Sequence, residues 1–352
     1  MSQVADKLIG GIPLFAGIER AEFESFLRVF RPVAVAAGAT LVRQGQSADG
    51  AYIIESGDAD VITALPGGGE AAVAKLGPGS VLGEMALLET GARSATVIAR
   101  SPLAAHFIER DGFRMLLAQR NRAAFTIQNR ITRTLCQRLR ELNAKIVAAD
   151  TPENAAPPLA GASADPGSVG RGACSFDYRA FLPLLPPFRR FSAGELEGFT
   201  GRTEVLELAR GQILFQQGDA GERAFLVVRG ALEILRAENG RRHRIGVLGP
   251  GRLCGVLALI EGQAHSMSAA AREPTVLLEI SKTDFDAWFS GDDPVAAKFQ
   301  DAINRELLQS LGRANIHLTR LISQARIRGG RQETKQAEEL QQALGTQDCR
   351  AA

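Results

Sequence analysis

Residues 83–97 read GEMALLETGARSATV. The carboxylate of Glu84 stands nine residues before the guanidinium of Arg93, and most of the other side chains in the stretch are small or aliphatic. Gly83 has no Cβ that would keep a ligand from the backbone. The residues after it can form one helical turn, whose first N–H groups favour an anion. Arg93 offers a forked, permanently charged donor for phosphate oxygens, and Glu84 accepts hydrogen bonds from hydroxyls. The segment therefore predicts a site for the cyclic phosphate of a ribose.

The chain carries a second, altered copy of this segment. Residues 255–269 read GVLALIEGQAHSMSA, so that Val256 stands where the acid was and His265 where the base was. Other residues recur in the same order: Gly38, Gly45, Gly57, LGPG at 76–79, Pro102, Phe113, Ile131 and Leu135 match Gly211, Gly218, Gly230, LGPG at 248–251, Pro274, Phe285, Ile303 and Leu307. Such self-similarity predicts a duplicated domain.

The composition between and after the copies sets the predicted boundaries. The stretch 149–175 is rich in Pro, Gly, Ala and Ser, with almost nothing to bury, and it predicts a flexible linker. The first domain is then expected at 1–148, the second at 176–324, and a polar C-terminal tail at 325–352.

Within the first copy, short strand-like segments precede a helix. ATLVRQG, GAYIIESG, DADVITAL, AAVAKLG and SATVIAR are rich in Val and Ile and separated by glycine, which predicts a rolled β structure. Apolar residues then recur every three or four positions from Ile127 to Ile146, within a helix expected over 115–147. The class is therefore α+β. We expect Arg122, Arg130, Arg133 and Arg140 on the solvated face of this helix, and a capping box at Ser192–Glu195.

Composition argues against several other classes. The 352 residues are 45% hydrophobic and 23% charged, and the net charge of +2 does not suggest a nucleic-acid-coating surface. No apolar run approaches the ~20 residues that span a bilayer, and no signal peptide is evident. Four scattered cysteines suit a reducing cytoplasm, and the abundance of arginine and alanine suggests a bacterial source. The four histidines stand far apart, so we expect no metal site. No nucleophile–base constellation is visible either, and we expect no cofactor and no catalytic residues.

Residues 83–97 resemble the phosphate-binding cassette of the cyclic-nucleotide-binding domain, a family that includes kinase regulatory subunits, the catabolite activator protein and gated channels. The family pattern is roughly G-E-[LMI]-A-L, a short turn, then R-[AST]-A-[TSA]-V, and each fixed element is present. The resemblance covers 5–146, with a degenerate echo over 178–320. It implies two tandem domains, each an eight-stranded, jelly-roll-like β-roll with flanking helices.

The resemblance also implies roles for the cassette residues. Glu84 is expected to bind the ribose 2′-hydroxyl and Arg93 the exocyclic phosphate oxygens, and the full predicted ligand set is Gly83, Glu84, Met85, Ala86, Arg93, Ser94 and Ala95. The backbones of Gly83, Ala86 and Ser94 complete the anion cradle. In the kinase families, Ala after the arginine accompanies cAMP and Thr accompanies cGMP. Ser94 is intermediate, and because the catabolite activator family carries Ser there, cAMP is favoured while cGMP stays open.

The second copy departs from the pattern where binding depends on it. Val256 cannot accept a hydrogen bond from a sugar hydroxyl, and leaving that group buried without a partner costs ~1–3 kcal/mol. His265 is mostly neutral at pH 7 and offers no fork. We expect a retained scaffold that has lost its ligand, and the alternative is a different anion that His265 binds.

These features predict a non-enzymatic, cytoplasmic receptor that signals through helix movement to an unidentified protein partner. It could be the regulatory subunit of a kinase or another enzyme. A transcription regulator like the catabolite activator is disfavoured, because only the polar tail follows the second copy and direct DNA binding needs a further module. A homodimer through the helix at 115–147 is possible, and no membrane contact is expected.

Overall fold

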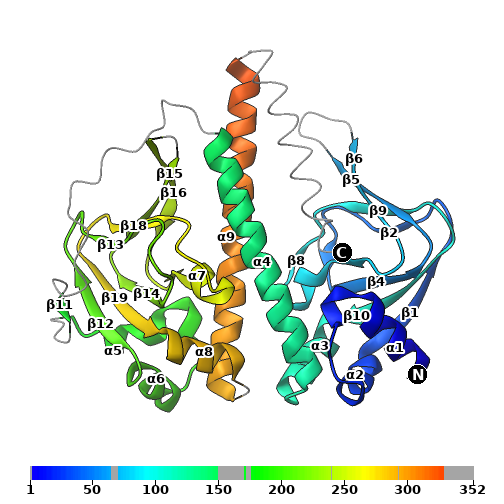
Figure 1. Cartoon of the computed structure of the whole chain (residues 1–352), viewed down its shortest axis with the longest axis horizontal. Coiled ribbons are helices and arrows are strands. Elements are labelled where there is room, and N and C mark those ends of the chain that lie inside the picture. Colours follow the sequence, from blue (N-terminus) through cyan, green and yellow to red (C-terminus); the bar gives the residue numbers. More distant parts are fainter. Residues whose placement is uncertain are drawn as a thin grey trace. The chain divides into compact units, whose positions relative to one another are not determined.

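The computed structural model of the chain describes residues 2–64, 70–149, 170–171, 176–238, 240–291 and 293–328. These residues form two compact units (Figure 1). The second unit spans Leu139–Leu321, and the first holds the residues before it and the end of helix α9 (Pro294–Arg328). Each unit is an α+β domain, as the duplicated sequence predicts. The second unit begins inside helix α4 (Arg122–Ala149), ahead of the predicted boundary at residue 148.

Two sheets build the first unit. Their strands are β1 (Phe30–Val35), β2 (Thr40–Val42), β4 (Gly50–Ser56), β5 (Ala59–Ala64), β6 (Glu70–Leu76), β7 (Val81–Leu82), β9 (Thr96–Ala99) and β10 (Leu103–Glu109). The sheet orders are β1-β10-β4-β7 and β2-β9-β5-β6, and a small ribbon pairs β3 (Ser47–Ala48) with β8 (Gly91–Ala92). All the pairings are antiparallel. The two four-stranded sheets confirm the predicted eight-stranded β-roll.

Aliphatic side chains from both sheets fill the roll. Val42, Ile54, Val61, Val97 and Leu103 are among its buried residues. Along β9 the side chains alternate between buried and half-buried, because successive residues of a strand point to opposite faces. The cassette, which enters β9, is thereby anchored to the core.

Short helices gather at one end of the first roll (Figure 1). They are α1 (Ser2–Gly11), α2 (Arg20–Phe26) and α3 (Arg110–Ala118). Between them lies a cluster of aromatic rings, in which Phe15 and Phe23 are 5.0 Å apart and Phe26 meets both Phe30 and Phe113 edge to face. The rings are buried or half-buried, and this cluster fixes the helices against the roll.

The second unit repeats this topology. Its strands are β12 (Glu204–Leu208), β13 (Ile213–Phe215), β14 (Arg223–Arg229), β15 (Leu232–Glu238), β16 (Arg241–Leu248), β17 (Leu253–Cys254), β18 (Ser268–Ala271) and β19 (Thr275–Ser281), with helices α5 (Tyr178–Phe181), α6 (Ala193–Thr200), α7 (Val256–Glu261) and α8 (Lys282–Ser290). The orders β12-β19-β14-β17 and β13-β18-β15-β16 correspond strand by strand to those of the first unit. The predicted capping box opens α6, where Ser192 and Glu195 bond each other's backbone N–H groups.

Equivalent glycines take equivalent conformations in the two units. Gly57 and Gly230 have φ angles of 86° and 82°, in the left-handed region that favours glycine. A Cβ at Gly57 would lie 2.5 Å from the carbonyl oxygen of Pro102, and one at Gly230 would lie 2.5 Å from that of Pro274. The glycines and prolines that match between the two copies therefore make the same close backbone contact in each unit.

The expected linker at 149–175 lies mostly outside the described residues. Ala149 ends α4, and Gly170–Arg171 form β11, which pairs with β12 at the edge of its sheet. Of the expected tail at 325–352, only the part up to Arg328 is described, and it is helical. No helix in the described ranges combines the length and the apolar character needed to cross a membrane.

The helix expected over 115–147 is interrupted, and this prediction was wrong at its start. Helix α3 ends at Ala118 and α4 begins at Arg122. Arg120 adopts a φ of 59°, and the N–H groups of Arg120 and Asn121 return to carbonyls of α3, which is how such a left-handed residue ends a helix. The Asn121 side chain then accepts from the N–H of Ala124 at 2.9 Å and caps α4. The apolar stripe is confirmed as buried at Ile127, Ile131, Leu135, Leu139, Leu142 and Ile146.

Two of the four helix arginines are also not simply solvated. Arg130 donates to the carbonyl oxygens of Leu14 and Ala16, at 2.9 and 2.6 Å. Arg140 donates from Nε to Glu261 at 2.7 Å, within the second unit. The prediction of a solvated face was wrong for both, because long arginine side chains reach partners that lie far away in sequence.

Substitution of Gly230 separates conformational strain from steric contact. Gly218→Ala, at a φ of 95° in open space, should cost roughly 1–2 kcal/mol of stability from left-handed strain alone. Gly230→Ala adds the contact with Pro274 and should cost about 1–3 kcal/mol more. Urea unfolding followed by the fluorescence of Trp288, which is buried in the second unit and is the chain's single tryptophan, measures both. Equal losses would show that the contact relaxes without cost.

Candidate functional site

The cassette forms a tight turn between two strands of the first roll. Gly83 follows β7 in a left-handed conformation with a φ of 75°, and a 3₁₀ turn comes next at Glu84–Leu87. A Cβ at Gly83 would lie 2.1 Å from Nη1 of Arg93. Glycine is therefore required on two counts, because it permits the left-handed conformation and leaves room for the guanidinium. The predicted helical turn is confirmed.

The guanidinium of Arg93 is buried and only partly satisfied. The residue is 8% exposed, and its Cζ lies 5.5 Å from the centre of the Tyr52 ring. Nη2 reaches Oδ1 of Asp49 at 3.3 Å, whereas Nη1 is buried without a hydrogen-bond partner among the described residues. A buried charged donor without a partner is costly, so this atom is suited to an incoming anion.

Burial also perturbs the groups around Arg93. It lowers the pKa of the Arg93 guanidinium, although Tyr52 and Asp49 oppose that change. Burial raises the pKa of the Tyr52 phenol, which Arg93 opposes. Arginine remains protonated in proteins, so the site presents a positive charge beside a neutral aromatic ring. Asp49 is 70% exposed and can turn into solvent if an anion takes its place.

Glu84 forms an ion pair with a helix residue. Its Oε1 lies 3.0 Å from Nη2 of Arg138 on α4, and both side chains are almost fully buried. Nη1 of Arg138 also lies 3.7 Å from the sulfur of Met85. The carboxylate predicted to accept from sugar hydroxyls is therefore held by the helix that follows the roll. The ion pair orients the carboxylate and links the cassette to α4.

The other predicted residues lie in different surroundings. The N–H of Ala86 donates to the carbonyl oxygen of Gly83 at 2.9 Å, so it serves the turn itself in this structure. Ala95 is buried in the core of the roll, and Ser94 is exposed. The structure thus brings Gly83, Glu84 and Arg93 to one turn. The proposed ligand contacts of Met85, Ala86, Ser94 and Ala95 stay predictions.

Sequence reasoning missed Arg138, Asp49 and Tyr52. Arg138 did leave a signal, because it falls on the same helical face as Ile131 and Leu135. A charged residue on a buried face requires a buried partner, and Glu84 was the acid already singled out. Asp49 and Tyr52 gave no such signal, because strand pairing alone brings them to the cassette.

The second unit has lost the buried charged residues of this site. In the register of the repeat, Val256 replaces Glu84, Ser310 replaces Arg138, His265 replaces Arg93 and Phe225 replaces Tyr52. Val256 and His265 are buried, and the His265 ring stacks on Phe215 at 3.8 Å. Burial lowers the pKa of His265, although Asp219 opposes the change, so the ring is neutral at pH 7.

Comparison with known proteins agrees with this architecture. The model of one family, described as the cyclic nucleotide-binding domain, matches residues 32–120 and 205–292. Each match covers most of one roll together with its cassette or the altered copy, and the two matches together span about half of the chain.

Individual relatives are similar over most of this chain. A cAMP-dependent protein kinase regulatory subunit of Mycosarcoma maydis is 27% identical over 278 residues, which is 76% of this chain and 43% of that protein. One of Blastocladiella emersonii is 23% identical, over 79% of this chain and 57% of that protein. The chain thus spans about half the length of these relatives. Both organisms are eukaryotic, so they do not support the bacterial source expected from composition.

One solved structure is similar to this chain at lower sequence identity. It is the regulatory domain of Toxoplasma gondii PKA, crystallised with cAMP, and it is 16% identical to this chain. The matched region covers 88% of this chain and 97% of the Toxoplasma chain. The TM-score of this match is 0.33.

The second unit itself supplies a test of the Glu84–Arg138 pair. Arg138→Ser alone removes the cation beside a buried carboxylate and should cost about 3–5 kcal/mol of stability. Combining it with Glu84→Val installs the residues found at the same register in the second unit, and most of that loss should be recovered. Urea unfolding, followed by the ¹³C-methyl signals of Met85 and Met115 in the first unit, measures the free energy of unfolding of each variant. A double variant no more stable than Arg138→Ser would show that the two side chains are not coupled.

Proposed function

The chain belongs to the cyclic nucleotide-binding domain family, and we propose that its first unit is the working receptor, with cAMP as the ligand. The observation that carries this proposal is the buried Nη1 of Arg93, which lacks a protein partner among the described residues and lies beside a glycine turn. A singly charged cyclic phosphate would supply the missing acceptor. A charged hydrogen bond in such a desolvated place is among the strong ones.

Each side chain then has a defined task. Arg93 binds the phosphate oxygens, and Gly83 allows them to approach the backbone. Asp49, which is largely exposed, gives way to the phosphate. Glu84 accepts from a ribose hydroxyl while Arg138 holds the other side of the carboxylate. The preference for cAMP over cGMP rests on Ser94 and on the relatives' description as cAMP-dependent.

Output is proposed to pass through α4. Arg138 of this helix contacts both Glu84 and Met85. A ligand whose hydroxyl donates a hydrogen bond to Glu84 therefore changes the interaction between Glu84 and Arg138. A ligand that favours one packing of α4 by a few kcal/mol would shift the population of that state. The similarity to kinase regulatory subunits favours a cytoplasmic, non-enzymatic regulator whose partner is a kinase catalytic subunit or another enzyme.

Titration calorimetry with cAMP tests the receptor. One molecule should bind per chain, because only the first unit keeps both Glu84 and Arg93. Arg93→Ala should weaken binding by ~2–5 kcal/mol, since it removes the charged partner of a desolvated phosphate. Glu84→Ala should cost less, ~1–3 kcal/mol.

Arg100→Ala is the matched control, because Arg100 is exposed and pairs with Asp60 on the same roll. It should bind like the unaltered protein. Saturation at two equivalent sites, or an Arg93→Ala variant with unchanged affinity, would contradict the assignment. A parallel titration with cGMP decides the base preference.

Hydrogen exchange with and without cAMP tests the transmission step. Protection should increase in residues 80–97 and change in α4. In Arg138→Ser the cassette response should persist while the response of α4 is reduced, because the contact that links them is lost. A response confined to 80–97 in the unaltered protein would show a binder without this switch.

A further inference from the structure

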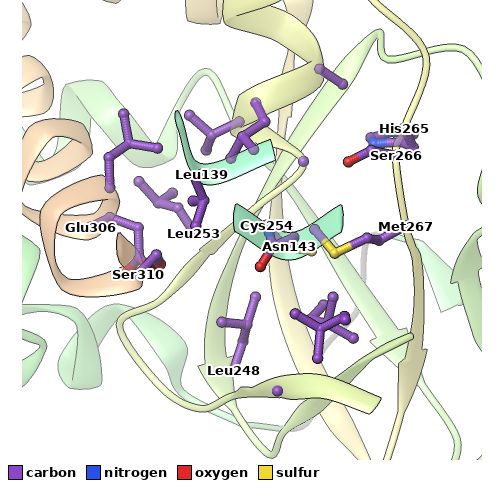
Figure 2. A pocket seen from close by; sticks show the side chains of 18 of the residues that line it. Leu139, Asn143, Leu248, Leu253, Cys254, His265, Ser266, Met267, Glu306 and Ser310 are labelled. Carbon is purple, nitrogen blue, oxygen red and sulfur yellow. Dashed lines mark hydrogen bonds between the residues drawn. The ribbon is translucent and has the colours of Figure 1, made fainter. Parts of the chain in front are cut away.

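The second unit contains a cavity where the first unit has its cassette site. Its volume is about 180 Å³. Hydrocarbon side chains from the roll and from α9 form most of its wall, among them Ile234, Ile245, Leu248, Leu253 and Leu307. Figure 2 shows Glu306 and Ser310 on one side of the cavity and His265, Ser266 and Met267 on the other. Leu139, Cys254 and Asn143 lie between them.

Several residues that line this cavity differ from their counterparts in the first unit. Val256 and Ser310 stand where the first unit has its buried ion pair. Phe215 and Met267 replace Val42 and Ala95, so large apolar side chains occupy the end at which the first unit holds Arg93. The loss of a ligand would not by itself require larger apolar side chains at these two positions.

The charges at the cavity do not favour an anion. His265 is stacked on Phe215, and its neutral ring cannot replace a guanidinium. Arg313 at the rim donates to Ser310 at 2.8 Å and lies 3.4 Å from Glu306. Glu306 also accepts from Arg252, and burial raises its pKa to about 7. The cations near the rim are therefore engaged, and an anion would meet a carboxyl group.

We propose that this cavity binds an uncharged aromatic molecule of mainly hydrocarbon surface and excludes cyclic nucleotides. An apolar cavity of about 150 Å³ in another protein stays dry and binds benzene, so this volume suits one or two fused rings. The flat wall made by Phe215 and His265 provides an aromatic face for stacking. The amide of Asn143, which also lines the cavity, provides hydrogen-bonding groups for one polar substituent.

The methionine methyl groups separate this site from the first one. Of the four methionines, Met85 lies in the first cassette and Met267 lines the cavity. With ¹³C-methyl methionine in the full chain, indole should shift the Met267 signal and leave Met85 unchanged. Indole-3-carboxylate, which adds one negative charge, should bind at least tenfold more weakly. cAMP should shift Met85 and leave Met267 unchanged.

Two variants add a second measurement. Ser310→Phe fills the cavity and Val256→Glu places a carboxyl in its wall, so each should weaken indole binding at least tenfold. Trp288 fluorescence, recorded without indole, reports whether the second unit stays folded. Arg272→Ala, an exposed residue outside the cavity, should change nothing.

The unaltered protein decides the question even if both variants unfold. An indole titration that leaves Met267 unmoved overturns the proposal, and so does a Met267 shift caused by cAMP. Because Met85 responds separately to cAMP, failure here leaves the receptor role of the first unit to its own test.

Discussion

The arrangement of the first cassette depends on the guanidinium of Arg93, which is held against Gly83 with one nitrogen that has no hydrogen-bond partner among the described residues. Placing a charged group in so buried a position is unfavourable unless something compensates. Asp49 and the Tyr52 ring compensate in part, and Nη1 remains without a partner among the residues described. The requirement for glycine at position 83 follows from making room for this cation.

The ion pair between Glu84 and Arg138 gives the cassette a route outward. A ligand inside a β-roll is hidden from a partner protein, so its presence has to be carried by an element that can move. Arg138 lies on α4 and contacts two consecutive cassette residues, Glu84 and Met85. In the second unit the equivalent positions hold Val256 and Ser310, so this link is absent there. The two units thus differ in the contact between the cassette and the helix that packs on it.

Much of the fold could be predicted from the sequence, because glycine and proline positions repeat where the backbone makes the same close contact. Gly57 and Gly230 illustrate this, and the altered copy of the cassette was recognisable for the same reason. The break between α3 and α4 could not be predicted, because Arg120 takes a left-handed conformation that is usually reserved for glycine.

The site was predicted only in part, for a different physical reason. Glu84 and Arg93 are close in sequence, so a motif contains both of them. Asp49 and Tyr52 come to the same place through strand pairing, and Arg138 comes through helix packing, which no local pattern records. In the second unit, Phe215 and Met267 are likewise distant in sequence, and only the folded structure shows that both line one cavity.

The most direct test is the preference of the first unit for cAMP over adenosine, which differs from it by the cyclic phosphate. If Arg93 supplies the phosphate contact, the unaltered protein should prefer cAMP by on the order of 100-fold or more. Arg93→His, which installs the residue of the second unit, should remove most of that preference while adenosine binding stays similar. An unchanged preference in Arg93→His would contradict the account.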